Sequence, residues 1–135
     1  MCDYGREIRF TSIGVVRNEI EEPTKPDAIK AVESTIILDP ALVDGLNGLE
    51  AGGRVTVLFH FDRANDYELM QHPRGDTSRP KRGLFALRTP RRPNGIGVTI
   101  VDILSIEGNV LRVRGLDAID GTPVLDLKPP IEGEG

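Results

Sequence analysis

The strongest constraint on the fold is an alternation of apolar and other residues with a period of two. In RVTVLFHFD, Val55, Val57 and Phe59 share one face of an extended chain. The segment GVTIVDILSIE repeats the pattern from Val98 onward, and a turn at residues 107–109 then leads into VLRVRGL, which predicts a hairpin. Further strands are predicted at IRFTSIGVVR, STIILD, GLFALRT and VLDLK.

These short, evenly spaced strands predict an all-β fold. Residues 40–46, behind a possible N-cap at Asp39, indicate at most a short helix. We expect a single-sheeted β-barrel with long connecting loops, because closure removes exposed strand edges. The length predicts one domain over residues 1–135, with a flexible tail from about residue 129 and no C-terminal accessory domain. Residues 63–82 keep no period and are expected to be a functional or disordered connection.

Composition excludes several classes of protein. No apolar run approaches the roughly eighteen residues that a membrane span requires, and the charged start differs from a signal peptide. A cytoplasmic location is therefore expected. Cys2 is the only cysteine and His60 and His72 are the only histidines, so neither an internal disulfide nor a metal site is predicted. The Gly-Ile-Gly at residues 95–97 leads into a strand, which excludes a dinucleotide-binding fingerprint.

A basic corner stands out in this acidic chain of net charge -4. The segment RGLFALRTPRRPNGIG, residues 82–97, combines arginines with prolines that stiffen the backbone and glycines that permit a close turn or an open groove floor. This pattern predicts a ligand site in which Arg91, Arg92 and Asn94 project from an ordered loop. The alternative is a tight strand connection whose arginines are only solvated.

A second unusual turn, GLDAIDGTP, follows at residues 115–123. Its two carboxylates, Asp117 and Asp120, lie three positions apart between glycines. Either Asp120 caps its own turn, or the pair accepts hydrogen bonds from ribose hydroxyls or an ammonium group. Together the basic corner and the acidic turn suit a zwitterionic ligand that carries additional positive charge.

Both long motifs resemble those of one known family. FALRTPRRPNGIG and GLDAIDGTPVLDLKP, with Phe10–Arg17 in the pattern F-x-x-I-G-V-V-R, are similar to the signatures of the TrmO family, also called TsaA-like or YaeB-like proteins. The resemblance implies a single-sheeted β-barrel that binds S-adenosylmethionine and works as a homodimer. It also implies methylation of N6 of threonylcarbamoyl-adenosine beside the tRNA anticodon.

The resemblance further implies site residues. The cofactor would be held by Pro23, Thr24, Lys25, Asp62, Arg63, Arg88, Val98, Asp117, Ala118, Ile119 and Asp120. Arg88 would meet the cofactor carboxylate, because a guanidinium matches a carboxylate bidentately. Asp120 or Asp62 would serve as the catalytic base, and Arg91, Arg92 and Asn94 would meet RNA phosphate or a base edge. Two departures from the family pattern are Asp62-Arg63 in place of His-Gln, and Gly95 in place of proline.

Two other functions remain open from the sequence. One is a non-catalytic RNA-binding barrel, which would share the basic corner but would have few aromatic side chains on which bases stack. The other is a methyltransferase that acts on another RNA or on a small molecule. Steep salt dependence of RNA binding would distinguish an RNA partner from a small substrate.

Overall fold

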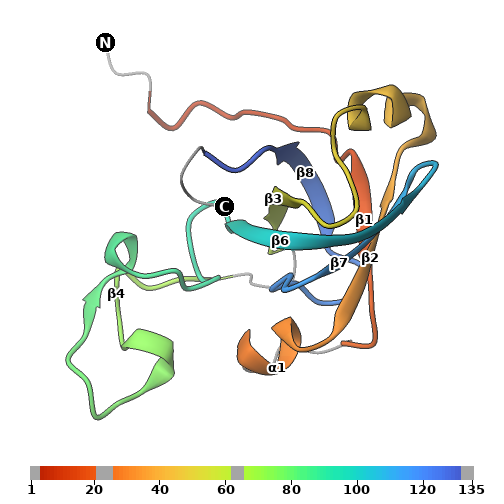
Figure 1. Cartoon of the computed structure of the whole chain (residues 1–135). Coiled ribbons are helices and arrows are strands. Elements are labelled where there is room, and N and C mark those ends of the chain that lie inside the picture. The colour runs from red at the N-terminus through yellow and green to blue at the C-terminus, as the bar shows by residue number, and fades with distance from the viewer. Residues whose placement is uncertain (1–3, 21–25, 62–65, 132–135) are drawn as a thin grey trace.

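The computed structural model describes residues 4–20, 26–61 and 66–131 of the chain. Its body is a closed barrel of six strands in the order β1-β2-β7-β6-β3-β8, in which every neighbouring pair is antiparallel (Figure 1). The barrel strands are β1 (Gly14–Arg17), β2 (Glu33–Leu38), β3 (Arg54–His60), β6 (Ile96–Glu107), β7 (Val110–Arg114) and β8 (Pro123–Lys128). The predicted all-β barrel is confirmed.

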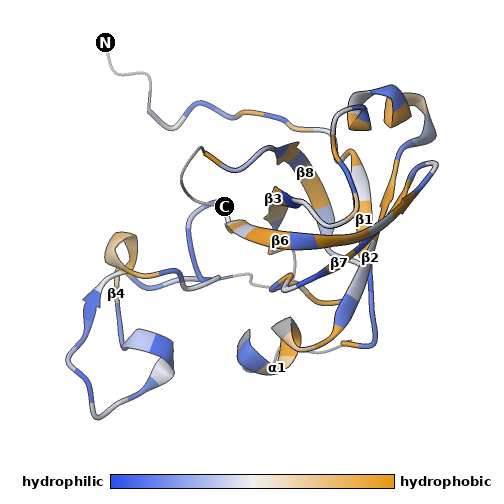
Figure 2. Ribbon diagram, viewed as in Figure 1, coloured by the Kyte–Doolittle hydropathy of each residue, from blue (hydrophilic) through white to orange (hydrophobic). Residues whose placement is uncertain are grey.

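The core is built from the alternate residues that the period predicts. Val55, Val57 and Phe59 of β3 are buried. Leu111 and Val113, which are alternate residues of β7, are buried in the same core. Hydrophobic residues accordingly concentrate on the barrel strands, whereas the segment at the lower left is largely hydrophilic (Figure 2). No helix in the described part of the chain is long and apolar enough to cross a membrane.

Short helical turns cover parts of the barrel. The predicted short helix is confirmed as the 3-10 helix η1 (Pro40–Leu46), where the Asp39 carboxylate accepts a hydrogen bond from the Ala41 N–H at 3.0 Å. A second helix, α1 (Pro26–Lys30), was not predicted. The first strand begins only at Gly14, so the residues before it in IRFTSIGVVR are not part of a strand, although the Ile13 N–H still donates to the Val124 carbonyl of β8 at 2.8 Å.

The long connection after β3 is an excursion away from the barrel (Figure 1). It contains a two-stranded hairpin of β4 (Met70–Gln71) and β5 (Arg82–Gly83), with the 3-10 turn η2 (Pro73–Gly75) between the strands. The prediction of a strand over GLFALRT was wrong. After Gly83 the chain forms the 3-10 turn η3 (Leu84–Ala86), closed by a hydrogen bond from the Leu87 N–H to the Leu84 carbonyl.

The segments that carry the two motifs leave the barrel at the same end. β1, β3 and β7 finish there, and β2, β6 and β8 begin there, as the pairs Glu33↔Arg114, His60↔Ile96 and Val15↔Pro123 require. We call this the loop end of the barrel. Closure of the sheet therefore gathers the connections after β1, after β3, before β6 and between β7 and β8 around one rim.

Candidate functional site

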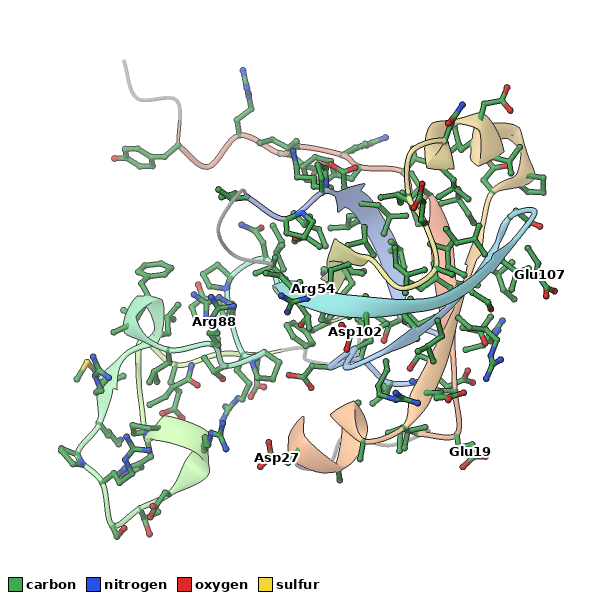
Figure 3. All side chains as sticks on the ribbon, in the orientation of Figure 1. Glu19, Asp27, Arg54, Arg88, Asp102 and Glu107 are labelled. Atoms are coloured by element: carbon green, nitrogen blue, oxygen red, sulfur yellow. The ribbon has the colours of Figure 1, made fainter. Side chains whose placement is uncertain are left out.

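Arg88 lies in the excursion close to where it rejoins the barrel (Figure 3). Its side chain lines a cavity of about 450 Å³ on the outer wall of β3, β6 and β8, which we call the outer-wall cavity. Arg88 is exposed and forms no ion pair with any residue that the structure describes. The lining consists of Thr56, Arg88, Val98, Thr99, Ile100, Lys128, Pro129 and Ile131.

The lining of this cavity suits a ligand with one acidic group and an apolar portion. Arg88 and Lys128 supply positive charge, and two threonines supply hydroxyl groups. Apolar side chains such as Val98, which is half exposed, form the remaining wall. A concave, partly apolar surface with a few convergent polar groups is the usual form of a small-molecule site.

The corner after Arg88 is held together by contacts of Arg92. Its guanidinium donates hydrogen bonds to the carbonyls of Leu87 at 2.7 Å and Thr89 at 3.2 Å. It also lies 6.0 Å from the ring centroid of Phe85. The Arg92 side chain therefore fastens its own loop. The sequence had instead predicted that this side chain projects from the loop toward a ligand.

Arg91 and a buried glutamine join the excursion to this corner. The Arg91 guanidinium lies 3.4 Å from the Asp66 carboxylate. Gln71, which is 9% exposed, donates from its amide to the carbonyls of Glu68 at 2.7 Å and Arg91 at 2.9 Å. Asn94 is exposed at the tip of the corner. Among the three proposed RNA contacts, Asn94 is thus the side chain that the surrounding hydrogen bonds leave most accessible.

The two glycines of the corner have different roles. Gly95 has a φ of +60°, which favours glycine, and its carbonyl accepts a hydrogen bond from the Phe61 N–H at 2.7 Å. Gly97 is not the floor of an open groove. A Cβ at this position would lie 2.6 Å from Phe59 Cε2 and 2.8 Å from Phe61 Cε2. The absence of a side chain therefore makes room for these two rings, which pack edge to face at 5.1 Å.

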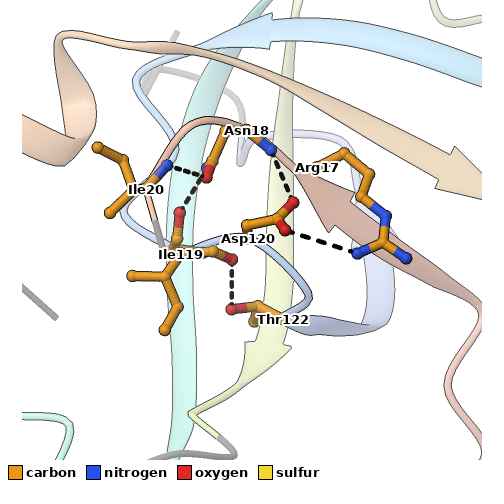
Figure 4. A network of polar contacts seen from close by, with 7 residues as sticks. Arg17, Asn18, Ile20, Ile119, Asp120 and Thr122 are labelled. Carbon is orange, nitrogen blue, oxygen red and sulfur yellow. Dashed lines mark hydrogen bonds and ion pairs between the residues drawn. The ribbon is translucent and has the colours of Figure 1, made fainter. Parts of the chain in front are cut away.

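Asp120 belongs to a polar network that ties the β7–β8 loop to the end of β1 (Figure 4). Its carboxylate accepts a hydrogen bond from the Asn18 N–H at 3.0 Å and lies 3.7 Å from the Arg17 guanidinium. The Asp120 N–H donates to the Ile20 carbonyl at 2.6 Å. This aspartate thus caps a strand end far away in the sequence, and not its own turn.

Asn18 is the centre of the same network and was missed by the sequence analysis. Its amide donates to the Ser34 hydroxyl at 3.0 Å and to the Ala118 carbonyl at 2.8 Å, and its side-chain oxygen accepts from the Ile20 N–H at 2.9 Å. An asparagine directly after a strand signals a turn, but nothing in the sequence indicates partners about a hundred residues away.

The structure brings together only some of the predicted cofactor residues. Arg88 and Val98 line the outer-wall cavity, whereas Asp117, Ala118, Ile119 and Asp120 lie in the β7–β8 loop at the loop end and do not line it. Pro23, Thr24, Lys25, Asp62 and Arg63 lie outside the described residues. Thr56, Thr99 and Lys128 line the cavity without having been predicted, because period-two alternation assigns a residue to a face of the sheet but does not identify its neighbours.

Relatives of the chain carry names that refer to one cofactor. A probable S-adenosyl-L-methionine-binding protein of Methanothermobacter thermautotrophicus is 42% identical over 131 residues, which covers 93% of this chain and 92% of the relative. A tRNA (adenine(37)-N6)-methyltransferase of Mus musculus is 43% identical over 89 residues, covering 64% of this chain and 20% of the mouse protein.

A crystal structure of TrmO from Pseudomonas aeruginosa has the same fold, with a TM-score of 0.69 and 33% sequence identity. The match covers 93% of this chain and 57% of the TrmO chain, so this chain spans little more than half of that protein. The model of the tRNA-methyltransferase O N-terminal domain family matches residues 14–133. That range includes both motifs and every strand of the barrel, and the chain belongs to this family.

Proposed function

We propose that the chain binds S-adenosylmethionine and is a methyltransferase that acts on N6 of threonylcarbamoyl-adenosine beside the tRNA anticodon. The observation that carries this proposal is the placement of Arg88 in the outer-wall cavity, beside threonine hydroxyls and an apolar wall. The names of the relatives support the same cofactor and the same class of reaction.

The residues of the cavity fit the carboxylate and the apolar parts of the proposed cofactor, whereas the described lining contains no acidic side chain for its positive charges. Arg88 would bind its carboxylate through two parallel hydrogen bonds. Val98 and the other apolar side chains would pack against the ring system, and Thr56 and Thr99 would meet polar groups. The further proposed cofactor residues lie beyond this cavity: Asp117 to Asp120 at the loop end would meet the positive charges of the cofactor, and Pro23, Thr24, Lys25, Asp62 and Arg63 are proposed to contact it as well. When bound, the cofactor supplies an electrophilic methyl group, so the protein contributes chiefly by positioning.

The attacking nitrogen must lose a proton, and Asp120 and Asp62 are the carboxylates proposed to accept it. The Asp120 side chain is 31% exposed, which leaves it accessible from the loop end. Its two oxygens are nevertheless engaged with Asn18 and Arg17. If Asp120 is the base, replacing it with asparagine lowers kcat more than it raises KM. If Asp62 is the base, it is Asp62→Asn that lowers kcat more than it raises KM.

The basic excursion is proposed to meet the RNA backbone. Arg74, Arg79, Lys81 and Arg82 are all exposed on it. Contacts of this kind release condensed counterions, so RNA affinity falls steeply with added salt. An anticodon-loop base is already unpaired, which makes its presentation to an active site inexpensive. The active form is proposed to be a homodimer.

Calorimetric titration with S-adenosylmethionine tests the cofactor site. We expect binding by the unmodified chain and loss of most affinity in Arg88→Ala. Arg82→Ala is the matched control, because it removes an exposed arginine of the same excursion outside the cavity. Equal loss in both variants would refute a specific role for Arg88. Methyl transfer is then measured on tRNA with and without the threonylcarbamoyl group, and activity on neither would refute the proposed acceptor.

A further inference from the structure

The edge of β8 that faces β1 is open over its last residues. β1 pairs with β8 only at Gly14↔Val124 and Val15↔Pro123, and no described strand continues along Asp126–Lys128 on that side. The Leu127 N–H donates to the neighbouring Asp126 carboxylate at 2.9 Å in place of a strand carbonyl. An open edge of this kind can accept another extended chain.

A groove of about 420 Å³ runs along this open edge. One wall is β8 itself, with Leu127 and Lys128, and the other is η1, with Leu42 and Leu46. Leu42 is exposed, although its side chain is apolar. The groove thus combines a strand edge that has no described neighbouring strand with apolar walls, which are the two features that bind an extended amphipathic segment.

The segment before β1 is such a segment. It is extended and runs away from the barrel (Figure 1). Ile8 and Phe10 are 64% and 71% exposed. The Glu7 carboxylate and the Arg9 guanidinium lie 3.5 Å apart, which places these two side chains on one side of the extended backbone. Period-two geometry then places Ile8 and Phe10 on the opposite side.

Charge and hydrophobicity select one pairing between this segment and β8. Asp126 and Lys128 lie on one side of β8 with their charged groups 3.9 Å apart, as Glu7 and Arg9 do on the segment. One antiparallel register matches the two patterns, with opposite charges and apolar side chains directly opposed. Its pairs are Arg9–Asp126, Glu7–Lys128 and Ile8–Leu127.

Straight continuation of β1 within the same chain gives a different register. Its own alignment is fixed by the pair Gly14↔Val124 and by the hydrogen bond from the Ile13 N–H to the Val124 carbonyl at 2.8 Å. Straight continuation of β1 would place Phe10 opposite Lys128, which opposes an apolar side chain to a charged one. The favourable register is therefore available to a segment from another molecule.

We propose that residues 7–10 of one copy add as an antiparallel strand to the open β8 edge of a second copy, and that the exchange is reciprocal. Such an exchange forms a closed two-fold dimer, because each molecule offers one segment and one groove. The inference deepens the homodimer of the proposed function and rests on it.

Disulfide formation between single-cysteine proteins tests the exchange. Cys2 is replaced with serine, and one protein then carries Arg9→Cys while the other carries Asp126→Cys and a tag of different mass. We expect roughly tenfold more mixed disulfide than with Thr11→Cys in place of Arg9→Cys, because Cα atoms more than about 7 Å apart cannot be bridged. A single chain with Ser12→Cys and Asp126→Cys detects continuation of its own β1. A disulfide within that chain, without the mixed product, would overturn the exchange.

Light scattering separates the exchange from dimerisation itself. We expect Arg9→Glu to shift the protein toward monomer by opposing two carboxylates, and Asp126→Lys in the same chain to restore the dimer. A dimer that gives no mixed disulfide and does not respond to Arg9→Glu overturns the exchange but leaves the proposed homodimer standing. A monomeric unmodified protein overturns both.

Discussion

The carboxylate of Asp120 accepts a hydrogen bond from the backbone N–H of Asn18, although 102 positions separate the two residues. The bond fixes the β7–β8 loop against the end of β1, where the chain leaves the barrel. It gives the D-x-x-D-G-T-P motif an architectural role beside any role in binding. The β7–β8 loop and the connection after β1 belong to the same rim. Loss of this bond should therefore disturb the loop end while the barrel stays folded.

Asp120→Ala should therefore destabilise the protein. It removes the acceptor of a partly buried N–H, and such a loss costs about 1–3 kcal/mol. Urea unfolding measures the change in the free energy of unfolding. Asp44→Ala is the control, because Asp44 is an exposed residue of η1 and surface replacements usually stay within about 0.5 kcal/mol. Equal effects of the two variants would mean that the Asp120–Asn18 bond does not stabilise the fold.

Asn18→Asp should be at least as damaging, although it barely changes the shape of the side chain. The amide of Asn18 donates to the Ser34 hydroxyl and to the Ala118 carbonyl. A carboxylate cannot donate and would oppose the Ala118 carbonyl oxygen at close range. We expect a loss of roughly 2–3 kcal/mol in the same unfolding experiment. A loss as small as that of the exposed control would show that these two bonds are dispensable.

Gly97→Ala tests the packing of the aromatic pair. The new methyl group would approach the Phe59 and Phe61 rings to less than 3 Å. Overpacking of this kind typically costs about 1–3 kcal/mol, and it should be visible as a lower Tm. Gly83→Ala is the matched control, because nothing lies within 4 Å of a Cβ there and its φ is -61°. A Tm of Gly97→Ala equal to that of the control would contradict the assigned role.

The barrel was predictable because its strands are long enough to show the period. β3 alternates over its 7 residues, and β6, which has 12 residues, alternates as far as Ile103, after which a bulge shifts its register. GLFALRT misled because a similar alternation of Leu and Phe occurs over a 3-10 turn. There Leu84 is buried and Phe85 is 78% exposed, through a local bend that the period does not encode. The strands β4 and β5, each of 2 residues, are too short to give any periodic signal.

The candidate site was predictable in its residue types but not in its contacts. The sequence identified an arginine-rich corner. In the structure its arginines have different roles, because Arg88 lines a cavity whereas Arg92 fastens the loop. That difference depends on which carbonyls a guanidinium can reach after folding. The network around Asn18 was not predictable for the same reason, because its distant partners come from β2 and from the β7–β8 loop.

A pH dependence is expected from Glu33. A hydrogen bond from Arg112 and the charge of that arginine, with a smaller contribution from Arg114, hold the pKa of Glu33 below its ordinary value of 4.5. A group whose pKa is lower in the folded state stabilises it above the unfolded pKa, and the stabilisation is lost as pH falls through the folded pKa. The difference in stability between the unmodified protein and Glu33→Gln should therefore be constant above pH 4.5 and shrink below it.

Salt provides the internal control for that measurement. The ion pair is exposed, and the Debye length is only about 3 Å at 1 M salt. The difference between the two proteins should thus also shrink with added NaCl at neutral pH. A difference that keeps its size both in acid and in salt would arise from packing and not from the charge of Glu33.

Arg92→Lys should weaken cofactor binding although Arg92 does not line the outer-wall cavity. One guanidinium nitrogen, Nη1, donates to the carbonyls of Leu87 and Thr89, on either side of Arg88, while the delocalised group lies over the Phe85 ring. A lysine has a shorter side chain that ends in a more strongly hydrated point charge, so it holds these contacts less well. Arg88 would then sit on a looser loop that must be ordered during binding. We expect roughly tenfold lower affinity for S-adenosylmethionine, about 1.4 kcal/mol, by calorimetry. Arg82→Lys should leave the affinity unchanged, and unchanged affinity in Arg92→Lys as well would mean that the position of Arg88 does not depend on this fastening.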